Sequence, residues 1–315
     1  MTRVLVTGAE GFVGGRLVPR LLESGARVVA CHAPGTAPPE FQLSASLRDE
    51  CDRVELDICD RGEVERVLGA QAPDAVVHLA GLSDVGASWQ RIDDYYRVNV
   101  EGSEFVAAGA RALSDSCRLI VASSAEVYGR VPEDELPAGE ERPLRPRSPY
   151  AVTKAAAERL TLGQGAIAAR SFNLIGPGQS VQFALPSFAA QLAEIDAGRK
   201  EPLLRVGNLT SRRDFVHVDD GAEAYAILVE RGEPGRAYNV ARGEAVELAS
   251  ALGRLIEISG VSTEIREDPD RLRPADVPVL CGDASRLQAL GWRPRRSFDQ
   301  ALEAIWEDAR NAPPR

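Results

Sequence analysis

Cysteine and histidine are scarce in this sequence of 315 residues, which holds five cysteines and three histidines. The cysteines are odd in number and scattered, with no C-x-x-C pair: Cys31, Cys51, Cys59, Cys117 and Cys281. The histidines available to complete a metal site are His32, His78 and His217. This composition argues against a disulfide framework and a zinc site, so we expect reduced, unligated cysteines and no metal.

The sequence also lacks a long apolar segment and an excess of positive charge. No stretch reaches the roughly 20 apolar residues of a membrane helix, and the first residues lack the basic start and apolar run of a signal peptide. A net charge of -10 and a pI near 5.0 disfavour nucleic acid or an anionic membrane as the main partner. We therefore expect a cytoplasmic protein.

Short apolar runs alternate with amphipathic stretches along the first half of the chain. The amphipathic stretches include residues 61–68 and 94–113. The apolar runs lie at residues 27–31, 53–56, 75–79 and 117–122. This alternation predicts parallel βαβ units, and hence an α/β fold with a Rossmann-type doubly wound parallel sheet.

The regular alternation ends near residue 172, after which short mixed elements predict a smaller C-terminal lobe. With 44% hydrophobic residues, the chain can bury a sizeable core. We assign residues 1–172 to a Rossmann domain, to which residues 214–241 return. Residues 173–213 and 242–315 then form a second, smaller domain.

A glycine-rich segment follows the first expected strand, residues 4–7. Gly8, Gly11 and Gly14 have the spacing G-x-x-G-x-x-G and lead directly into a helical pattern. Glycines there allow a tight turn, a close approach to a diphosphate and close packing of the helix on the sheet. The helix N-terminus directs N–H groups at the anion. The segment therefore predicts a dinucleotide site.

Tyr150 and Lys154 are four residues apart in a helix-forming segment, which places both side chains on one helix face. A nearby ammonium favours the phenolate and lowers the pKa of a tyrosine from its usual value of roughly 10. The pair therefore predicts a proton-transfer site. The Pro-rich and charged segment 130–149 leads into Tyr150, and we expect this loop to cover the substrate.

Six segments, taken in order, carry a resemblance to a known family: residues 7–14, 57–60, 78–80, 99–100, 123–129 and 150–154. They resemble the extended short-chain dehydrogenase/reductase family, nucleotide-sugar branch, and the resemblance covers nearly the whole chain. Within that branch, four segments look most like GDP-4-keto-6-deoxymannose reductases: residues 170–179, 206–209, 213–215 and 271–278.

The resemblance implies roles for particular side chains. Ser124 would bind the sugar C4 oxygen, Tyr150 would exchange a proton with it, and Lys154 would hold the nicotinamide ribose and lower the pKa of Tyr150. Ser123 is the competing hydroxyl, and His78 is expected to be a packed core imidazole. The cofactor-binding positions would be Gly8, Gly11, Phe12, Val13, Arg16, His32, Asp57, Ile58, Leu79, Ala80, Asn99, Tyr150 and Lys154.

The choice of cofactor depends on the end of the second expected strand, residues 28–32. An NAD enzyme usually places an acidic residue there to bind the adenosine ribose, and this sequence has none. With Arg16 and His32 nearby, the site favours NADP(H), with NAD(H) as the alternative. Arg16 fits an exposed helix position equally well.

Glu126 bears on which reaction the shared frame performs. The family's 4,6-dehydratases use a glutamate at this place to abstract the C5 proton, with help from a neighbouring side chain. Ala125 cannot deliver a proton, which disfavours the Asp-Glu form of that chemistry, and Glu126 stays a candidate base or substrate contact. The sequence predicts reduction of the C4 ketone of a GDP- or dTDP-linked 4-keto-6-deoxyhexose. The alternatives are a 4,6-dehydratase, a 4-epimerase and a non-catalytic NADP(H)-sensing module.

The expected substrate is a nucleotide-diphosphate sugar, and the smaller lobe offers donors that suit it. Arginine matches phosphate oxygens in a fork. The family further implies a homodimer. The substrate-binding positions would be Ser83, Ser124, Asn173, Gln179, Val206, Arg213 and Arg273.

Overall fold

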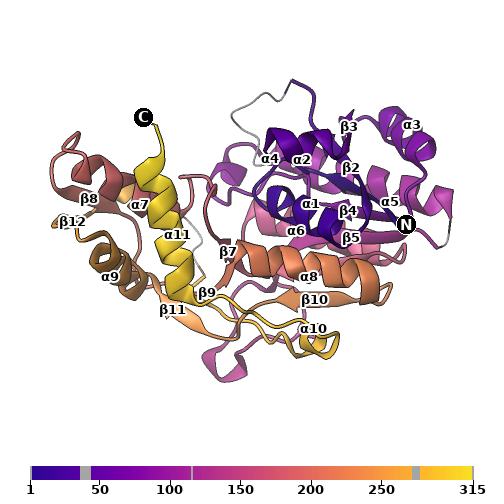
Figure 1. The fold of residues 1–315 in the computed structure, drawn as a ribbon. Coiled ribbons are helices and arrows are strands. Elements are labelled where there is room, and N and C mark those ends of the chain that lie inside the picture. The colour runs from indigo at the N-terminus through magenta and orange to yellow at the C-terminus, as the bar shows by residue number, and fades with distance from the viewer. Residues whose placement is uncertain (1, 36–43, 115, 272–276, 314–315) are drawn as a thin grey trace.

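The computed structural model describes residues 2–35, 44–114, 116–271 and 277–313. It has a large lobe built on a seven-stranded sheet and a small lobe that contains the C-terminal helix (Figure 1). All six strand pairs of the large sheet are parallel, and their order is β10-β6-β5-β4-β1-β2-β3. The predicted fold class is therefore confirmed. Within the described part of the chain, every helix is too short or too polar to span a bilayer.

The inner strands of the large sheet form where the sequence has short apolar runs, because helices cover both faces and bury these strands on both sides. The edge strand β3 (Asp52–Glu55) differs, because Arg53 and Glu55 are exposed. The four predicted runs are β2 to β5. The seven strands are β1 (Arg3–Thr7), β2 (Arg27–His32), β3 (Asp52–Glu55), β4 (Ala75–His78), β5 (Arg118–Ser124), β6 (Ile167–Ser171) and β10 (Ala237–Val240).

Alternate residues of β1 face opposite layers. Val4 and Val6 pack in the core beneath α1 (Gly14–Glu23) and α8 (Val218–Arg231), whereas Leu5 packs in the core beneath the helices of the other face. The remaining helices of this lobe are α2 (Ala45–Asp49), α3 (Arg61–Gln71), α4 (Ile92–Tyr95), the π-helical turn η2 (Tyr96–Glu101), α5 (Gly102–Leu113) and α6 (Pro149–Leu162). Short 3-10 turns lie at η1 (Ala87–Trp89), η3 (Ala125–Tyr128), η4 (Glu133–Glu135) and η5 (Pro269–Arg271).

The small lobe has its own core, in which Phe188, Leu192, Leu255 and Trp306 are buried. Strand β9 (Arg212–His217) pairs with β7 (Asn173–Ile175), β11 (Ala245–Glu247) and β13 (Val279–Leu280). A second pair consists of β8 (Leu203–Val206) and β12 (Glu264–Glu267). The helices of the C-terminal half besides α8 are α7 (Ala184–Asp196), α9 (Leu248–Ser259), α10 (Ser285–Ala289) and α11 (Phe298–Asn311).

The division of the chain differs from the predicted boundaries in one segment. Val277, Leu280, Leu287 and Trp292 belong to the core of the large lobe, although they lie within the predicted substrate segment 242–315. The indole N–H of Trp292 donates a hydrogen bond of 2.9 Å to the backbone carbonyl of Asp220. These residues pack on the large lobe because α8 presents that carbonyl and an apolar surface, which local patterning does not reveal.

The prediction that loop 130–149 covers the substrate is wrong. Ala138 N donates to Cys281 O at 2.8 Å, so the loop is fixed to the segment that follows β13. The buried Arg170 donates to Glu140 O at 2.8 Å, which draws the same loop against the sheet beside β6. Its described residues therefore pack along the β6–β10 side of the large lobe, and the cavity between the lobes is lined by other segments.

Candidate active site

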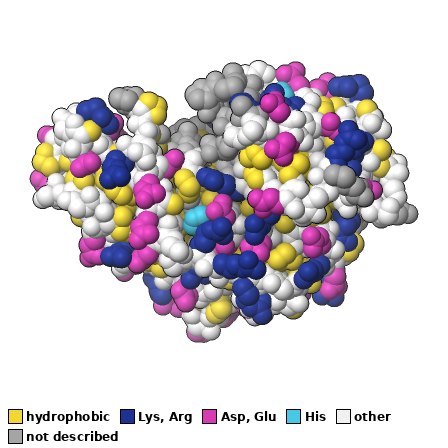
Figure 2. Space-filling model, viewed as in Figure 1, with side chains coloured by type: hydrophobic (Ala, Val, Ile, Leu, Met, Phe, Trp, Pro, Cys, Tyr) yellow, Lys and Arg dark blue, Asp and Glu magenta, His cyan; other side chains and the backbone are white. Residues whose placement is uncertain are grey.

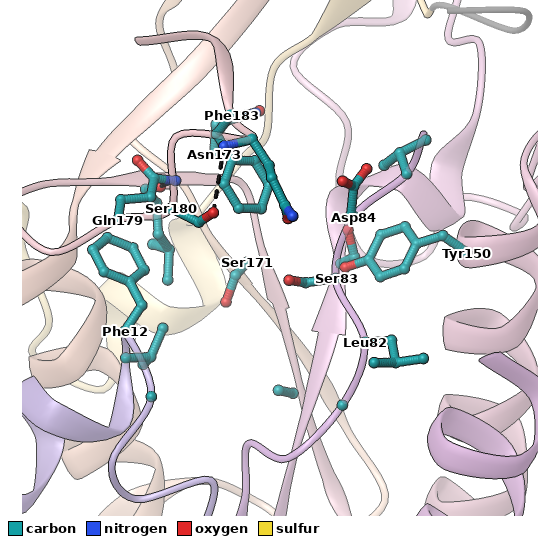
Figure 3. A pocket seen from close by; sticks show the side chains of 18 of the residues that line it. Phe12, Leu82, Ser83, Asp84, Tyr150, Ser171, Asn173, Gln179, Ser180 and Phe183 are labelled. Carbon is teal, nitrogen blue, oxygen red and sulfur yellow. Dashed lines mark hydrogen bonds between the residues drawn. The ribbon is translucent and has the colours of Figure 1, made fainter. Parts of the chain in front are cut away.

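A cavity of about 1310 Å³ lies between the two lobes, at the carboxyl ends of the parallel strands. It exceeds the roughly 300–1,000 Å³ of an ordinary small-molecule pocket, so it has room for two ligands. Figure 2 shows the surface hollowed between the lobes. In Figure 3, Tyr150 and Ser83 approach the centre from one side and Phe12 and Gln179 lie on the other, with Asn173 between them.

The glycine-rich loop forms one end of the cavity, where Gly8, Gly11, Phe12 and Val13 line the wall. Gly8 has a φ of +66°, in the left-handed region that favours glycine. A Cβ on Gly14 would lie 2.3 Å from Gly8 O, so only glycine lets α1 start this close to the loop. The N-cap, Val13, is apolar and makes no side-chain cap hydrogen bond. Gly15 N donates to Gly11 O at 2.8 Å, so among the first residues of α1 the N–H of Gly14 is the one left for an anion in the described part of the chain. These residues fit a dinucleotide diphosphate.

Past the glycine-rich loop, the cavity wall includes His32, Asp57 and Ile58, all predicted to contact the adenosine part of the cofactor. Asp57 Oδ1 accepts a hydrogen bond of 2.9 Å from Cys59 N, which fixes the turn after β3. Arg16 lies outside the lining of this cavity. Its guanidinium donates to Pro177 O at 3.0 Å and is 3.8 Å from Asp219, so it joins the lobes instead.

Leu79 and Ala80 follow β4 and line the middle of the cavity. Asn99 is buried behind them and holds this loop in place. Its amide nitrogen donates to Leu82 O at 3.0 Å, and its oxygen accepts from Leu82 N at 2.8 Å. Asn99 therefore acts on the cofactor site through the loop that it positions.

His78 is a packed, hydrogen-bonded imidazole, as predicted. Ser103 donates its hydroxyl to Asn99 O at 2.6 Å, so its oxygen accepts from His78 Nε2 at 3.0 Å. His78 Nδ1 then accepts from the Thr7 hydroxyl at 2.8 Å. Burial and the neighbouring Lys154 lower the pKa of His78 to about 3, so the ring stays neutral.

Helix α6 places Tyr150 and Lys154 at the centre of the cavity. It starts at Pro149 because the Ser148 hydroxyl accepts from Ala151 N at 3.1 Å and proline is preorganised for the first helical position. Lys154 is 8% exposed and donates to Ala122 O at 3.0 Å. Burial lowers the pKa of Lys154 to about 8.

The environment of Tyr150 raises its pKa, which is opposite to the predicted direction. The phenol is buried, packs edge-on against Tyr95 at 6.4 Å between ring centroids, and shares a hydrogen bond with Ser124. Loss of hydration penalises the phenolate more than the hydrogen bond to Ser124 favours it, and the negative charge of Glu126 adds to the penalty. Burial therefore decides the direction of the pKa shift, against the prediction, and Tyr150 keeps its proton at neutral pH.

The two neighbouring serines have different partners. Ser123 donates to Glu158 at 2.5 Å, and Glu158 is paired with Arg170 at 2.6 Å, so this hydroxyl belongs to a buried structural network. Ser124 accepts from Glu126 N at 3.2 Å and bonds to Tyr150. This arrangement supports Ser124 as the hydroxyl that acts with the tyrosine. Glu126 is half-buried and lines the cavity beside them.

The predicted substrate residues are distributed unevenly around the cavity. Ser83, Asn173, Gln179 and Arg213 line it, and Arg213 also donates to Val277 O at 2.8 Å. Val206 is buried in the core of the small lobe, and the two residues after it, Gly207 and Asn208, line the cavity in its place. Arg273 lies outside the described residues.

Sequence reasoning missed two parts of the substrate end. Arg271 lines the cavity and donates to the Ser187 hydroxyl at 3.1 Å. The N-terminus of α7 also faces the cavity, and its N-cap, Phe183, has an apolar side chain. Both suit a diphosphate. The signal for Arg271 was its place two residues before Arg273, whereas nothing local marked the direction of α7.

The sequence matches the family described as GDP-mannose 4,6 dehydratase over residues 5–305. The chain belongs to this family. It is 35% identical to GDP-6-deoxy-D-mannose reductase from Pseudomonas aeruginosa, over 97% of the chain and 96% of that protein. The predicted membership in the nucleotide-sugar branch of the extended short-chain dehydrogenase/reductases is thereby confirmed.

Two solved structures similar to this chain have the same fold. One is RMD from Pseudomonas aeruginosa complexed with NADPH, with a TM-score of 0.81, 32% identity and coverage of 98% of this chain and 99% of that one. The other is UDP-glucose 4-epimerase from Thermus thermophilus complexed with NAD, with a TM-score of 0.86, 30% identity and the same coverage. The same fold therefore carries NADPH in one of these proteins and NAD in the other.

Proposed function

We propose that this family member is an NADP(H)-dependent reductase, with NAD(H) as the alternative cofactor. It would reduce the C4 ketone of a nucleotide-linked 4-keto-6-deoxyhexose to the 6-deoxyhexose. The observation that carries the proposal is the neutral phenol of Tyr150, hydrogen-bonded to Ser124 at the centre of the cavity. Reduction of a ketone needs an acid at the carbonyl oxygen, and this phenol is one.

When bound, NADPH supplies the hydride that adds to C4. Tyr150 donates its proton to the C4 oxygen, which balances the addition of hydride and gives the alcohol. Ser124 holds the same oxygen by a second hydrogen bond and so orients the ketone. Lys154, whose ammonium lies in the cavity wall beside Ala122, would hold the nicotinamide ribose, and its positive charge would stabilise the phenolate left when Tyr150 has given up its proton.

One observation favours reduction over dehydration. A dehydratase needs a proton donor for the leaving C6 hydroxyl, and the buried Ala125 stands beside Glu126. Glu126 then contacts substrate without acting as a base. A non-catalytic sensor would have no use for Ser124, Tyr150 and Lys154 together.

The substrate end of the cavity suits a nucleotide diphosphate. Arg213 and Arg271 supply positive charge, and the N-terminus of α7 supplies N–H groups. Similarity to a GDP-6-deoxy-D-mannose reductase favours a GDP-linked over a dTDP-linked sugar. We further propose that the protein acts in the cytoplasm. We also propose that it is a homodimer, because the large apolar side chains of Tyr96 and Leu160 are 43% and 46% exposed.

The direct test is loss of NADPH absorbance with GDP- and dTDP-linked 4-keto-6-deoxyhexoses, each prepared with a known dehydratase. One NADPH consumed per ketosugar would establish the reductase and its nucleotide. Conversion of GDP-mannose or dTDP-glucose without consumption of added NADPH would replace it with a dehydratase.

The Glu126→Gln variant separates the same alternatives. A reductase would keep its rate within about threefold, because no proton is taken by Glu126. A dehydratase would lose about 10²- to 10⁴-fold, the usual contribution of a general base.

A further inference from the structure

The glycine-rich loop is joined to the end of β2 by its backbone. Ala9 N donates a hydrogen bond of 3.2 Å to Cys31 O, so the next residue, Glu10, lies beside the last residues of that strand. Glu10 lines the cavity together with Cys31, His32 and Ala33. This is the place where the adenosine ribose of a dinucleotide is read in a doubly wound sheet, and β2 itself supplies no carboxylate there.

Glu10 is a buried charge with one defined partner. It is 5% exposed, and its Oε1 lies 2.9 Å from Nη2 and 3.0 Å from Nε of Arg53 on β3. The register of the sheet sets Arg53 opposite Ala30, one residue before Cys31. The carboxylate of Glu10 therefore extends across the carboxyl end of β2 to reach the neighbouring strand.

The second oxygen of Glu10 is incompletely satisfied. Oε2 is buried and has no hydrogen-bond partner among the residues that the structure describes. A buried carboxylate oxygen without a donor is costly, and such atoms in a native protein call for a specific explanation. A ligand hydroxyl at the wall of the cavity would supply the missing donor.

We infer that Glu10 and Arg53 form the pair that reads the 2′ position of the adenosine ribose and sets the preference between NADH and NADPH. Glu10 Oε2 accepts a hydrogen bond from the 2′-hydroxyl of NADH, in place of the acidic residue that β2 lacks. Arg53, held beside that oxygen by Oε1, binds the 2′-phosphate of NADPH, which Glu10 alone would repel. The two charges favour different cofactors, and their balance decides which one binds more tightly.

The pair predicts opposite shifts for two variants of the full-length protein. Glu10→Gln keeps the size of the side chain but removes its charge, so the Kd for NADPH should fall several-fold and the Kd for NADH should rise. Arg53→Met should raise the Kd for NADPH by about tenfold or more, the usual effect of losing a hydrogen bond to a charged group, and change the Kd for NADH less than about threefold.

The measurement is titration of each purified protein with NADH and with NADPH, followed by the fluorescence of the bound nicotinamide. It rests on the cofactor use proposed above but needs no ketosugar, so it can succeed even if the proposed substrate is wrong. Arg27→Met is the matched control, because Arg27 is an ion-paired arginine at the opposite end of β2. Its ratio of the two Kd values should equal that of the unaltered protein.

Arg53→Met leaves Glu10 buried without its partner, and that variant could lose its fold. The double variant Glu10→Gln with Arg53→Met removes both charges, so no charge is left buried without a partner and the proposal can still be tested. Its Kd ratio should lie between those of the single variants. Equal changes in both Kd values for Arg53→Met, or a Kd ratio unchanged within twofold for Glu10→Gln, would overturn the assignment.

Discussion

Tyr150 and Lys154 lie on the same face of α6 but burial shifts their pKa values in opposite directions. Burial favours the neutral form of each group, which is the protonated phenol and the deprotonated amine. It therefore raises the pKa of Tyr150 and lowers the pKa of Lys154. At neutral pH the tyrosine is therefore protonated and the lysine still mostly charged. This combination is the one that a ketone reductase needs before hydride transfer.

The Tyr150→Phe variant should lose turnover and keep its cofactor. Removing the proton donor costs about 10²- to 10⁴-fold in kcat, the usual contribution of general acid catalysis. The Kd for NADPH, measured by fluorescence titration, should change less than about threefold, since the ring remains. Tyr96→Phe is the matched control and should have an unaltered rate. A Tyr150→Phe protein that retains full turnover would remove the proposed mechanism.

The rate should also depend on the charge of Lys154. With a pKa of about 8, the lysine is charged below pH 8 and loses its proton as the pH rises above it. We expect kcat/KM to be flat below pH 8 and to fall up to tenfold per pH unit above it, since kcat/KM reports groups of the free enzyme. Profiles from pH 6 to 10 would test this. A flat profile to pH 10 would show that the ammonium is not required.

The sequence predicted the positions of side chains that belong to a motif, but it did not predict their pKa values. Tyr150, Lys154 and Ser124 were predictable because their motifs end strands or open helices at the carboxyl edge of the sheet. The raised pKa of Tyr150 was not, because it depends on atoms from α4, β5 and α6 that meet only in the fold. Arg271 was missed although its place two residues before Arg273 was a signal.

At the scale of helices and strands, close approach decides which glycines are irreplaceable. A Cβ on Gly14 would meet the backbone of the cofactor loop at 2.3 Å, whereas one on Gly253, inside α9, would meet nothing within 4 Å. Both residues are helical. The two positions therefore separate helix propensity from packing.

Gly14→Ala should destabilise the protein by about 1–3 kcal/mol and raise the Kd for NADPH more than about tenfold, because the loop must move. Gly253→Ala should stabilise it by about 0.5–1 kcal/mol and leave the Kd unchanged, as alanine favours a helix. Urea unfolding and NADPH titration would measure both. Equal effects of the two substitutions would contradict the role given to the loop.

Strands β1 to β5 were predictable from short apolar runs, because helices cover the faces of the sheet. Strand β6 was not predicted as a strand. The position of segment 130–149 was not predictable, because it depends on partners from distant parts of the chain, among them Arg170 and Cys281. Arg170 pairs with Glu158 and holds the loop through Glu140 O. The charge pattern of segment 130–149 predicts an exposed loop, and only its tertiary contacts show where the segment packs. The segment around Trp292 was misplaced for a similar reason.

At the scale of the whole molecule, apolar exposure distinguishes the two lobes' surfaces. Tyr96 and Leu160 lie on η2 and α6, which contact one another in the large lobe, and Ile265 is exposed on β12 of the small lobe. An interface between two copies of the chain should cover the side chains of Tyr96 and Leu160. Ile265, which is exposed on β12 of the other lobe, then serves as a control.

Sedimentation should give a mass near twice the 33.8 kDa of the chain. Leu160→Glu should shift that mass toward one chain at micromolar concentration, because an interface does not readily bury an unpaired carboxylate. Ile265→Glu should leave it unchanged. A monomer before any substitution would exclude the proposed dimer.

The cavity has a further consequence because its two ends belong to different lobes. The groups that move a proton come from β5 and α6, whereas Arg213, Arg271 and the start of α7 come from the small lobe. Substitutions that change which nucleotide sugar binds can therefore accumulate without disturbing the reactive groups. In evolutionary terms, such a protein can acquire a new substrate after gene duplication while its chemistry stays under separate selection.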